Sequence, residues 1–270
     1  MKVNKIFLVL IVTVLAISCK KEEIGITTKN TGLLLSQITV NDQPTLQYTY
    51  NASKLITAEI SKYDLTQYNY DGSDQLAGTN YYLNYNILSS DAQVATAALS
   101  ANAWVTPDNA NQAGSGAYEF DGTGLLSKVT YNSPSGSLQH SEFVYDANGR
   151  ISKQILFWDN TETGHIDYTY DSKGNLIEED LFNVASDGSD ELSTTTAYEF
   201  DNQKNPYKAI SKLLIPGVYT NANNITKITY TIAVNSDQST ASVQVISNTY
   251  EYNSKGYPVS MNGNTKYIYM

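Results

Sequence analysis

Phe143-Val144-Tyr145-Asp146-Ala147-Asn148-Gly149 is one of three close copies of a single phrase in this chain of 270 residues. The other two are Tyr118-Glu119-Phe120-Asp121-Gly122-Thr123-Gly124 and Tyr168-Thr169-Tyr170-Asp171-Ser172-Lys173-Gly174. Each copy has two aromatic residues separated by one position, then Asp, then Gly three residues later. Looser copies start at Tyr48, Tyr68, Tyr198 and Tyr250, and residues 267–269 resemble a half copy. A phrase that recurs in this way indicates a repeated supersecondary unit.

Each copy predicts a β-hairpin. Two rings at positions i and i+2 lie on one face of an extended strand. The Asp that follows is favoured as the first residue of a type I turn, where its side chain binds nearby backbone N–H groups. Gly three residues later takes the left-handed conformation that closes this turn with a bulge. The turn fixes the register and predicts four cross-strand pairs, which are Phe120 with Leu126, Tyr145 with Ile151, Tyr170 with Leu176, and Tyr252 with Pro258.

The outer ring of each close copy is expected to face a long polar side chain, namely Lys128, Lys153 or Glu178, because the stem of such a side chain packs along a ring. Three looser copies lack the Gly. Lys54 and Asp74 take its place in the first two, and the sixth reads Asp201-Asn202-Gln203-Lys204-Asn205. A tighter or different turn is predicted at these three. The residues that define the repeat in the better copies are Tyr118, Phe120, Asp121, Gly124, Phe143, Tyr145, Asp146, Gly149, Tyr168, Tyr170, Asp171, Gly174, Tyr250, Tyr252 and Gly256.

Residues 145–151 resemble the consensus Tyr-Asp-x-x-Gly-Arg-Leu/Ile of the YD-repeat (Rhs-type) family, and residues 170–176 nearly match it. The resemblance is close over residues 118–182 and looser over 44–76 and 198–269. The chain also resembles Bacteroidetes lipoproteins that carry degenerate YD-like repeats, through Asn205-Pro206-Tyr207 and residues 223–230. This resemblance implies no assigned activity. Long Rhs proteins enclose a C-terminal toxin, but this chain ends on a predicted strand at Met270, so that function is not expected here.

The predicted fold is all-β, an antiparallel meander of repeated hairpins with about 14 to 16 strands. A sheet of this size twists and curls, so we expect it to be strongly curved or rolled into a barrel-like sheet. Residues 89–104 break the strand pattern, and Ser90 is a suitable N-cap, which predicts one short helix that covers an open end or edge. Residues 202–224 predict an irregular loop, because Pro206 and Pro216-Gly217 interrupt it. Residues 32–270 are expected to form a single domain.

The N-terminus predicts a secretory signal. Lys2 and Lys5 precede an apolar run over residues 6–15, and the small residue Ser18 precedes Cys19. The run is too short to span a bilayer permanently. Cys19 is the only cysteine of the chain and stands where bacterial lipoproteins are lipidated after cleavage. Residues 1–18 are therefore predicted to be a lipoprotein signal peptide, and the alternative is an ordinary signal peptide beside a chance cysteine.

A second targeting signal is expected just after the cleavage site. Residues 19–23 read Cys-Lys-Lys-Glu-Glu and resemble the acidic signal that exports such lipoproteins to the cell surface. The alternatives are a solvated tether and attachment at the periplasmic face of the outer membrane. Two or three acyl chains anchor a protein stably, whereas one chain is marginal. Residues 19–31 would then form a flexible tether between the membrane and the β domain.

Composition limits the partners of the chain. Its net charge is −10, and removal of residues 1–18 takes away Lys2 and Lys5 but no acid, which leaves −12. This field repels polyanions, so nucleic acid is not an expected partner. The single cysteine allows no disulfide within the chain. Twenty-two tyrosines against six phenylalanines suit half-buried faces, where a ring packs and its hydroxyl keeps a polar partner.

The sequence offers little for catalysis. His140 and Ser141 are adjacent, so they point to opposite faces of a strand and cannot form a nucleophile–base pair. A solvated strand histidine is the expected role for His140, and with His165 as the only other histidine we expect no His/Cys metal site. The acidic run 187–191 suits either calcium or a polar hairpin tip. We therefore expect no catalytic residues, no metal and no cofactor.

Trp104 and Trp158 are the candidate ligand-binding residues, because an exposed indole stacks on a sugar ring. The alternative is that both are packing anchors. The expected function is a non-catalytic surface or envelope lipoprotein of the outer membrane, which acts as a protein-interaction or structural module. Its alternative is a glycan-binding accessory lipoprotein. An exposed aromatic strip would favour the glycan, an apolar patch would favour a protein partner, and a pocket with perturbed acids would favour an enzyme.

Overall fold

The computed structural model describes residues 32–84, 104–136, 138–210, 213–234 and 237–270. Seventeen strands in these ranges form one sheet. They are β1 (Leu35–Val40), β2 (Gln43–Tyr50), β3 (Ile56–Ile60), β4 (Asp64–Tyr70), β5 (Leu76–Leu83), β6 (Asn111–Phe120), β7 (Leu126–Asn132), β8 (Leu138–Tyr145), β9 (Ile151–Trp158), β10 (Thr161–Tyr170), β11 (Leu176–Val184), β12 (Asp190–Phe200), β13 (Ile225–Val234), β14 (Asp237–Ser247), β15 (Tyr250–Tyr252), β16 (Pro258–Met261) and β17 (Thr265–Tyr269).

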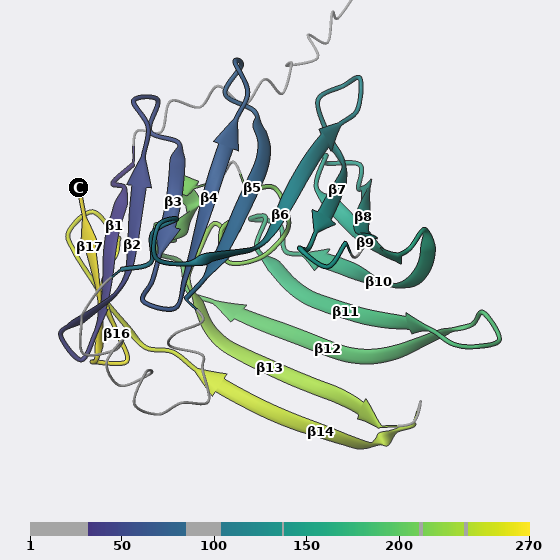
Figure 1. Cartoon of the computed structure of the whole chain (residues 1–270). Coiled ribbons are helices and arrows are strands. Elements are labelled where there is room, and N and C mark those ends of the chain that lie inside the picture. Colours follow the sequence, from purple (N-terminus) through teal and green to yellow (C-terminus); the bar gives the residue numbers. More distant parts are fainter. Residues whose placement is uncertain (1–31, 85–103, 137, 211–212, 235–236) are drawn as a thin grey trace, which may run out of the picture.

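The sheet is an antiparallel meander in which each strand from β1 to β13 pairs with the next, so that β13 pairs with β14. The chain then returns through β15 and β16 to β17, which pairs with β1. The N- and C-terminal strands therefore lie side by side. Figure 1 shows that the sheet rolls up, so that β11–β14 lie across an interior from β1–β5. The predicted all-β hairpin meander is confirmed, with one strand more than the upper expectation.

The repeat turns form as their residues predict. In the three close copies the Asp Oδ1 atom accepts hydrogen bonds from backbone N–H groups two and four residues later, at 2.8–3.0 Å. Gly124, Gly149 and Gly174 have φ of 83°, 74° and 85°, in the region that favours glycine. The four predicted cross-strand pairs, Phe120–Leu126, Tyr145–Ile151, Tyr170–Leu176 and Tyr252–Pro258, are all present.

The predicted partners of the outer rings are wrong by one position. Lys128, Lys153 and Glu178 face the residue between the two rings, and the rings themselves face Val129, Gln154 and Glu179. The register shifts because the bulge beside each turn adds a residue to the second strand. A two-residue alternation counted from the inner pair ignores this extra residue and therefore places every more distant pair wrongly.

The first two repeat copies use the same turn without glycine, which contradicts the prediction of a different turn. Lys54 and Asp74 have φ of 62° and 63°, and their N–H groups bond Asn51 O and Asp71 O at 2.9 and 3.2 Å. The central copies make the same bond from Gly124 N to Asp121 O at 3.0 Å. The sixth copy does differ, since the N–H of Asp201 bonds the distant carbonyl of Asn224.

The predicted helix over 89–104 falls almost wholly outside the described residues. After it, the segment 104–110 covers the face of β3–β5 that points away from the interior. Val105 is 1% exposed and packs against Ala58 and Leu65, and its N–H bonds Ser61 O at 3.0 Å. In the described part of the chain, a short 3₁₀ helix, η1 (Pro206–Ile210), lies within the segment 202–224 that was predicted to be an irregular loop. Within the described residues no helix has the length and apolar character needed to cross a bilayer.

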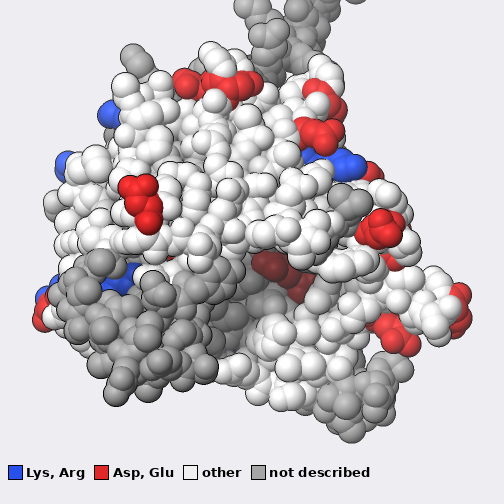
Figure 2. Space-filling view, in the orientation of Figure 1, with Lys and Arg blue, Asp and Glu red and all other residues white. Residues whose placement is uncertain are grey.

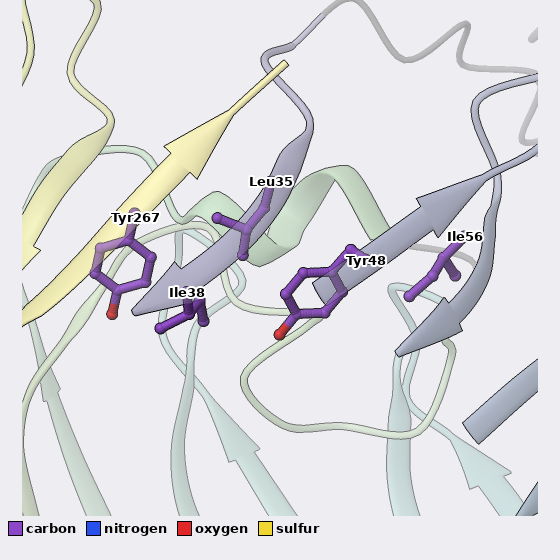
Figure 3. Close-up of a cluster of buried hydrophobic side chains, with 5 residues drawn as sticks. All are labelled: Leu35, Ile38, Tyr48, Ile56 and Tyr267. Carbon is purple, nitrogen blue, oxygen red and sulfur yellow. The ribbon is translucent and has the colours of Figure 1, made fainter. Parts of the chain in front are cut away.

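The main core lies inside the roll, where the N-terminal strand β1 pairs with the C-terminal strand β17. Leu35 and Ile38 of β1, Tyr48 of β2, Ile56 of β3 and Tyr267 of β17 form one buried cluster (Figure 3). The segment 201–224 packs on this cluster through Tyr207, Leu213 and Tyr219. This connection between β12 and β13 therefore occupies the interior and positions the polar groups described next.

Candidate functional site

Tyrosine hydroxyls join each hairpin to the one before it. Tyr145 donates to the carbonyl of Leu126 at 2.8 Å, and Tyr170 donates to that of Ile151 at 2.6 Å. In each case the acceptor is the residue that pairs with the inner ring of the preceding copy. The acceptor carbonyl is part of the backbone, so any residue in that position supplies it. The excess of tyrosine over phenylalanine thus has a structural cause, because a phenylalanine ring would pack without joining neighbouring repeats.

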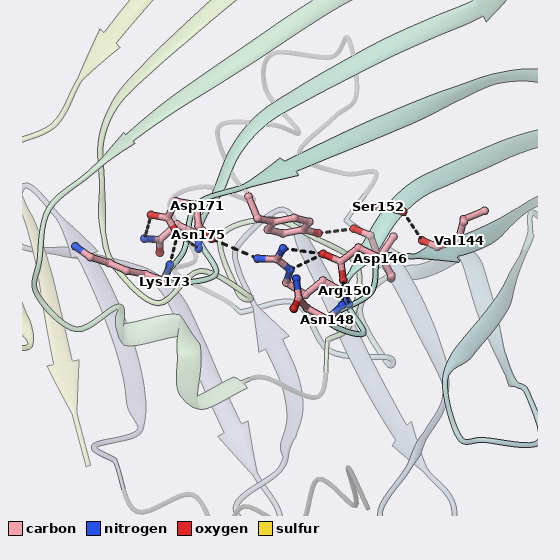
Figure 4. Close-up of polar contacts among 10 residues, drawn as sticks. Val144, Asp146, Asn148, Arg150, Ser152, Asp171, Lys173 and Asn175 are labelled. Carbon is pink, nitrogen blue, oxygen red and sulfur yellow. Dashed lines mark hydrogen bonds and ion pairs between the residues drawn. The ribbon is translucent and has the colours of Figure 1, made fainter. Parts of the chain in front are cut away.

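Arg150, the arginine of the repeat phrase, clamps two copies together (Figure 4). Its Nε donates to Asp146 Oδ2 at 2.8 Å, and one terminal nitrogen donates to Asp171 O at 3.3 Å. The guanidinium also lies over the Tyr170 ring, 4.5 Å from its centroid. Burial alone would raise the pKa of Asp146, but the hydrogen bonds from Arg150 outweigh it and lower that pKa. The contacts of Arg150 therefore assign it a structural role, which is to join the turns of two neighbouring copies.

Asn175 fastens the interior segment to the turn of the fifth copy. Its Nδ2 donates to Asp171 Oδ2 at 2.9 Å and to Asn223 Oδ1 at 3.0 Å. Its Oδ1 accepts from the backbone N–H groups of Ala222 and Asn223, at 2.9 and 3.0 Å. Asn221 Oδ1 also accepts a hydrogen bond from the N–H of Leu176, at 2.8 Å. Asn175 and Asn221 are each 1% exposed, so these amides are buried and satisfied.

Two glutamates lie among the interior tyrosines. Glu59 of β3 faces Tyr48, and its Oε2 accepts a hydrogen bond from the hydroxyl of Tyr219 at 2.6 Å. Burial raises the pKa of Glu59, and the hydrogen bonds from Tyr219 and Tyr48 offset part of that rise. Glu179 of β11 faces Tyr168 and accepts from Tyr198 at 2.9 Å, and burial raises its pKa too. Each carboxyl group thus has tyrosine partners of its own.

This arrangement can hold a proton on a buried carboxyl group, but its hydrogen bonds are already made within the protein. Figure 2 shows a hollow on one face of the molecule in which acidic side chains lie. A separate open groove of about 390 Å³ is lined by Gly32, Leu33, Lys204, Ser254, Lys255 and Tyr257. That groove contains neither Glu59 nor Glu179. The interior carboxyl groups are therefore best understood as parts of the packing between the segment 201–224 and the sheet.

The two candidate tryptophans differ in accessibility. Trp158 is 51% exposed at the end of β9, beside the turn formed by Asp159 and Asn160. Trp104 is half-buried, and its carbonyl accepts a hydrogen bond from Asn109 at 2.9 Å. Trp104 is the first residue of the segment that covers β3–β5, whereas Trp158 belongs to the β9–β10 hairpin, so the two do not form one strip. Cys19, the predicted lipidation site, lies outside the described residues.

The expectation of a solvated histidine is wrong. His140 is 9% exposed and stacks on Phe157 with ring centroids 4.4 Å apart. His165 is 5% exposed and stacks in the same way on Phe182, at 4.8 Å. Each phenylalanine lies directly opposite its histidine on the neighbouring strand. The sequence contained this signal, since both histidines stand three residues before the first ring of a repeat, but the bulged register concealed the pairing.

The acidic run 187–191 is the tip of the β11–β12 hairpin. Asp187 Oδ1 accepts hydrogen bonds from Ser189 N and Oγ at 3.0 and 2.6 Å, and these bonds lower the pKa of Asp187. The described part of the chain contains no group of three His, Cys, Asp or Glu side chains arranged to hold a metal ion. The hairpin-tip interpretation of this run therefore accounts for its contacts without a ligand.

Strand β14 is a surface feature that the sequence did not reveal. It pairs with β13, and its residues Ser242–Ser247 are exposed one after another, on both faces. Val243 is 60% exposed, Val245 53% and Ile246 46%. β14 runs along the lower margin of the molecule in Figure 1. An exposed strand edge is a template on which another chain can pair.

The sequence profile of a family described as Teneurin YD-shell matches residues 79–269. The chain belongs to this family. The match confirms the resemblance to YD repeats and takes in the copies that start at residues 118, 143, 168, 198 and 250. The first two copies precede the start of the match, although the same YD-shell sheet contains them. Among curated proteins, no sequence matches this YD-shell chain.

Solved structures that match this chain include two proteins described as porin-like. The one from Bacteroides uniformis is 11% identical, with a TM-score of 0.41, over 87% of this chain and 96% of its own. The one from Bacteroides vulgatus is 11% identical, with a TM-score of 0.40, over 88% of this YD-shell chain and 99% of its own. A TcdB2-TccC3 structure is 16% identical, with a TM-score of 0.30, over 77% of this chain and 10% of its own.

Proposed function

We propose that this YD-shell protein is a non-catalytic interaction module of the bacterial envelope, held at the outer membrane by lipid on Cys19 and exposed at the cell surface. The observation that carries the proposal is the exposure of β14, a strand of 11 residues whose residues Ser242–Ser247 are exposed on both faces. A free strand edge binds partners by adding a strand to the sheet, in which main-chain hydrogen bonds give affinity and side-chain contacts give specificity.

The interior of the shell supports this proposal. Tyr207, Leu213 and Tyr219 of its own segment 201–224 pack inside it. Asn175 and Asn221 fasten that segment, and the buried acids Glu59 and Glu179 are hydrogen-bonded to tyrosines. A reaction at these acids would first have to break their hydrogen bonds to Tyr219 and Tyr198. Binding at the outer edge requires no such change, so a function at the surface fits the observed packing better than a function inside.

Cross-linking on intact cells tests the interaction. The lipidated protein with a C-terminal tag is treated with a membrane-impermeant cross-linker, and we expect a discrete cross-linked species. A Val245→Lys substitution places a charge on β14 and should remove that species. Val144→Lys is the matched control, because Val144 is 46% exposed on β8, a strand paired on both sides. Failure to capture any species would contradict the proposed function.

The anchor is tested separately through Cys19. We expect a radiolabelled fatty acid to enter the intact protein but not the Cys19→Ser variant, and the variant to leave the outer-membrane fraction. Protease added to intact cells should digest the anchored protein. Digestion only after the outer membrane is permeabilised would place the shell on the periplasmic face and contradict surface exposure, while lipidation itself would stand.

Glycan binding is a second candidate function, which the exposure of Trp158 favours. An indole that is half exposed beside a hairpin turn offers a free face on which a sugar ring can stack. Binding to a panel of envelope and host polysaccharides should then be lost in Trp158→Ala and kept in Trp104→Ala, because Trp104 is half-buried in the segment that covers β3–β5. Equal binding by the two variants would contradict this candidate.

A further inference from the structure

The two outer strands of the sheet, β14 and β15, differ in how they are protected from pairing with another chain. β15 has three residues, Tyr250–Tyr252, with Glu251 at its centre. Such short, charged edges resist pairing with other chains. β14 has 11 residues, and its stretch Gln238–Ser247 contains no charged side chain, in a chain whose net charge is −10. Charges that would repel a like-charged neighbour are therefore absent from Ser242–Ser247, the part of β14 whose exposure the structure describes.

We propose that β14 pairs antiparallel with β14 of a second copy of this chain, about a two-fold axis at Gln244. This inference rests on the proposed interaction function and names its partner. Two-fold pairing requires a surface that is complementary to itself, in which residue i meets residue j and j meets i. The order Val243-Gln244-Val245 has this property, because an apolar residue stands on each side of the central one.

The register follows from that axis. Gln244 lies opposite Gln244 of the second copy, and Val243 lies opposite Val245 of the second copy. By symmetry the reverse pair forms as well, so four valines meet on one face. This face is the one that carries Thr229 and Thr231 of β13, the partners of Val245 and Val243. Ile246, on the other face and 46% exposed, would lie opposite Ser242 of the second copy.

A second copy explains the composition of β14 better than a charged partner does. A basic partner strand would be recognised by acids, and an acidic one by lysines, but Gln238–Ser247 has neither. Pairing through one strand buries less than the roughly 1,200 Å² of a standard stable interface. We therefore expect weak association in solution. Confinement of two anchored copies to one membrane raises their effective concentration and favours the dimer there.

Engineered cysteines test both the dimer and its register. Directly opposed residues of an antiparallel pair have Cα atoms about 4.5–5.5 Å apart, within the range that a disulfide spans. Mild oxidation of cells that carry the full-length Gln244→Cys protein should give a disulfide-linked dimer. Val243→Cys meets its own copy only diagonally, at about 7–8 Å, so its dimer should be at least tenfold weaker. Differently tagged Val243→Cys and Val245→Cys chains, expressed together, should join to each other.

The controls separate this inference from the function on which it rests. The unsubstituted chain, oxidised in the same way, shows whether Cys19 contributes, and thermal unfolding shows that each variant is folded. Equal dimer from Gln244→Cys and Val243→Cys, or none from either, would overturn the proposed pairing. A disulfide from Gln244→Cys to a different protein would overturn the dimer yet leave the interaction function standing. No cross-link by any reagent would contradict both.

Discussion

The first two repeat copies, at residues 48–76, and the three central copies, at 118–176, form the same turn from different residues. The central copies place glycine at the left-handed position, whereas the first two place Lys54 and Asp74 there. What both regions share is the Asp or Asn that begins the turn, whose side-chain oxygen binds the N–H four residues later. The Asp or Asn therefore specifies this turn, and glycine only relieves the strain of a positive φ.

The largest effect is expected where the two regions agree. Leu126 of the central region and Leu76 of the first region both stand opposite the inner ring of their copy, and they are 0% and 2% exposed. Leu126→Ala and Leu76→Ala should each lower the free energy of unfolding by about 2–5 kcal/mol, measured by urea denaturation. Val144→Ala, at an exposed position, should change it by about 0.5 kcal/mol or less. A small effect at Leu76 alone would show that the first hairpins are not part of the cooperative fold.

The next largest effect should distinguish the regions. Tyr170 of the central region donates to Ile151 O, but the buried hydroxyl of Tyr70 has no partner among the described residues. Tyr170→Phe leaves a buried carbonyl without its donor and should cost about 1–2 kcal/mol. Tyr70→Phe removes only an unsatisfied hydroxyl, so unfolding should occur at an unchanged or slightly higher urea concentration. Equal losses in the two variants would show that the hydroxyl bonds do not join the repeats.

The repeated hairpins were predictable because their information is local. An Asp or Asn, the residue four positions on and the two rings lie within one short phrase, so turn type and inner pairs such as Tyr145–Ile151 follow from sequence. The bulge adds one residue, and every pair beyond it shifts, which is why the expected partners of the outer rings and the exposure of His140 were wrong. Register beyond a bulge depends on backbone geometry that side-chain identity does not encode.

The arrangement of the interior was not predictable, because its contacts join residues far apart in the chain. Asn175 bonds to Asn223, and Tyr219 bonds to Glu59, across 48 and 160 positions. Residues 202–224 contain turn-forming residues, which predicted a loop but not its place inside the roll. The exposure of β14 was equally hidden, since alternation of polar and apolar residues is typical of paired and unpaired strands alike.

The third prediction concerns the left-handed turn residue, where substitution should change the free energy of unfolding in opposite directions in the two regions. Lys54→Gly removes a side chain from a left-handed residue and should raise the free energy of unfolding by about 0.5–1 kcal/mol. Gly174→Ala, in the central region, introduces a side chain at φ +85° and should lower the free energy of unfolding by about 1 kcal/mol. A Cβ at Gly174 would meet no atom within 4 Å, so steric contact does not complicate the measurement. A stabilising Gly174→Ala would contradict the strain account.

The smallest effect is the dependence of stability on pH, for which each region has one buried acid. Burial raises the pKa of Glu59 in the first region and of Glu179 in the central region. A carboxyl group whose pKa is raised by folding stabilises the folded state at pH below its pKa in the unfolded chain, about 4.3. This stability is lost as the pH rises through its pKa in the folded state. The melting temperature should therefore increase as pH falls from 7 toward 5.

Glu59→Gln and Glu179→Gln should each weaken that increase and raise the melting temperature at pH 7, since an amide carries no charge to desolvate. Below about pH 4 the melting temperature should instead fall as the pH falls. Hydrogen bonds lower the pKa of Asp121, and they outweigh burial to lower that of Asp171, so the stability from these turn acids is lost as they are protonated. Melting curves from pH 7 to 3 should therefore show a maximum in both variants and in the unaltered protein. If Glu59→Gln keeps the full increase between pH 7 and 5 while Glu179→Gln loses it, the buried acid of the central region alone governs the response.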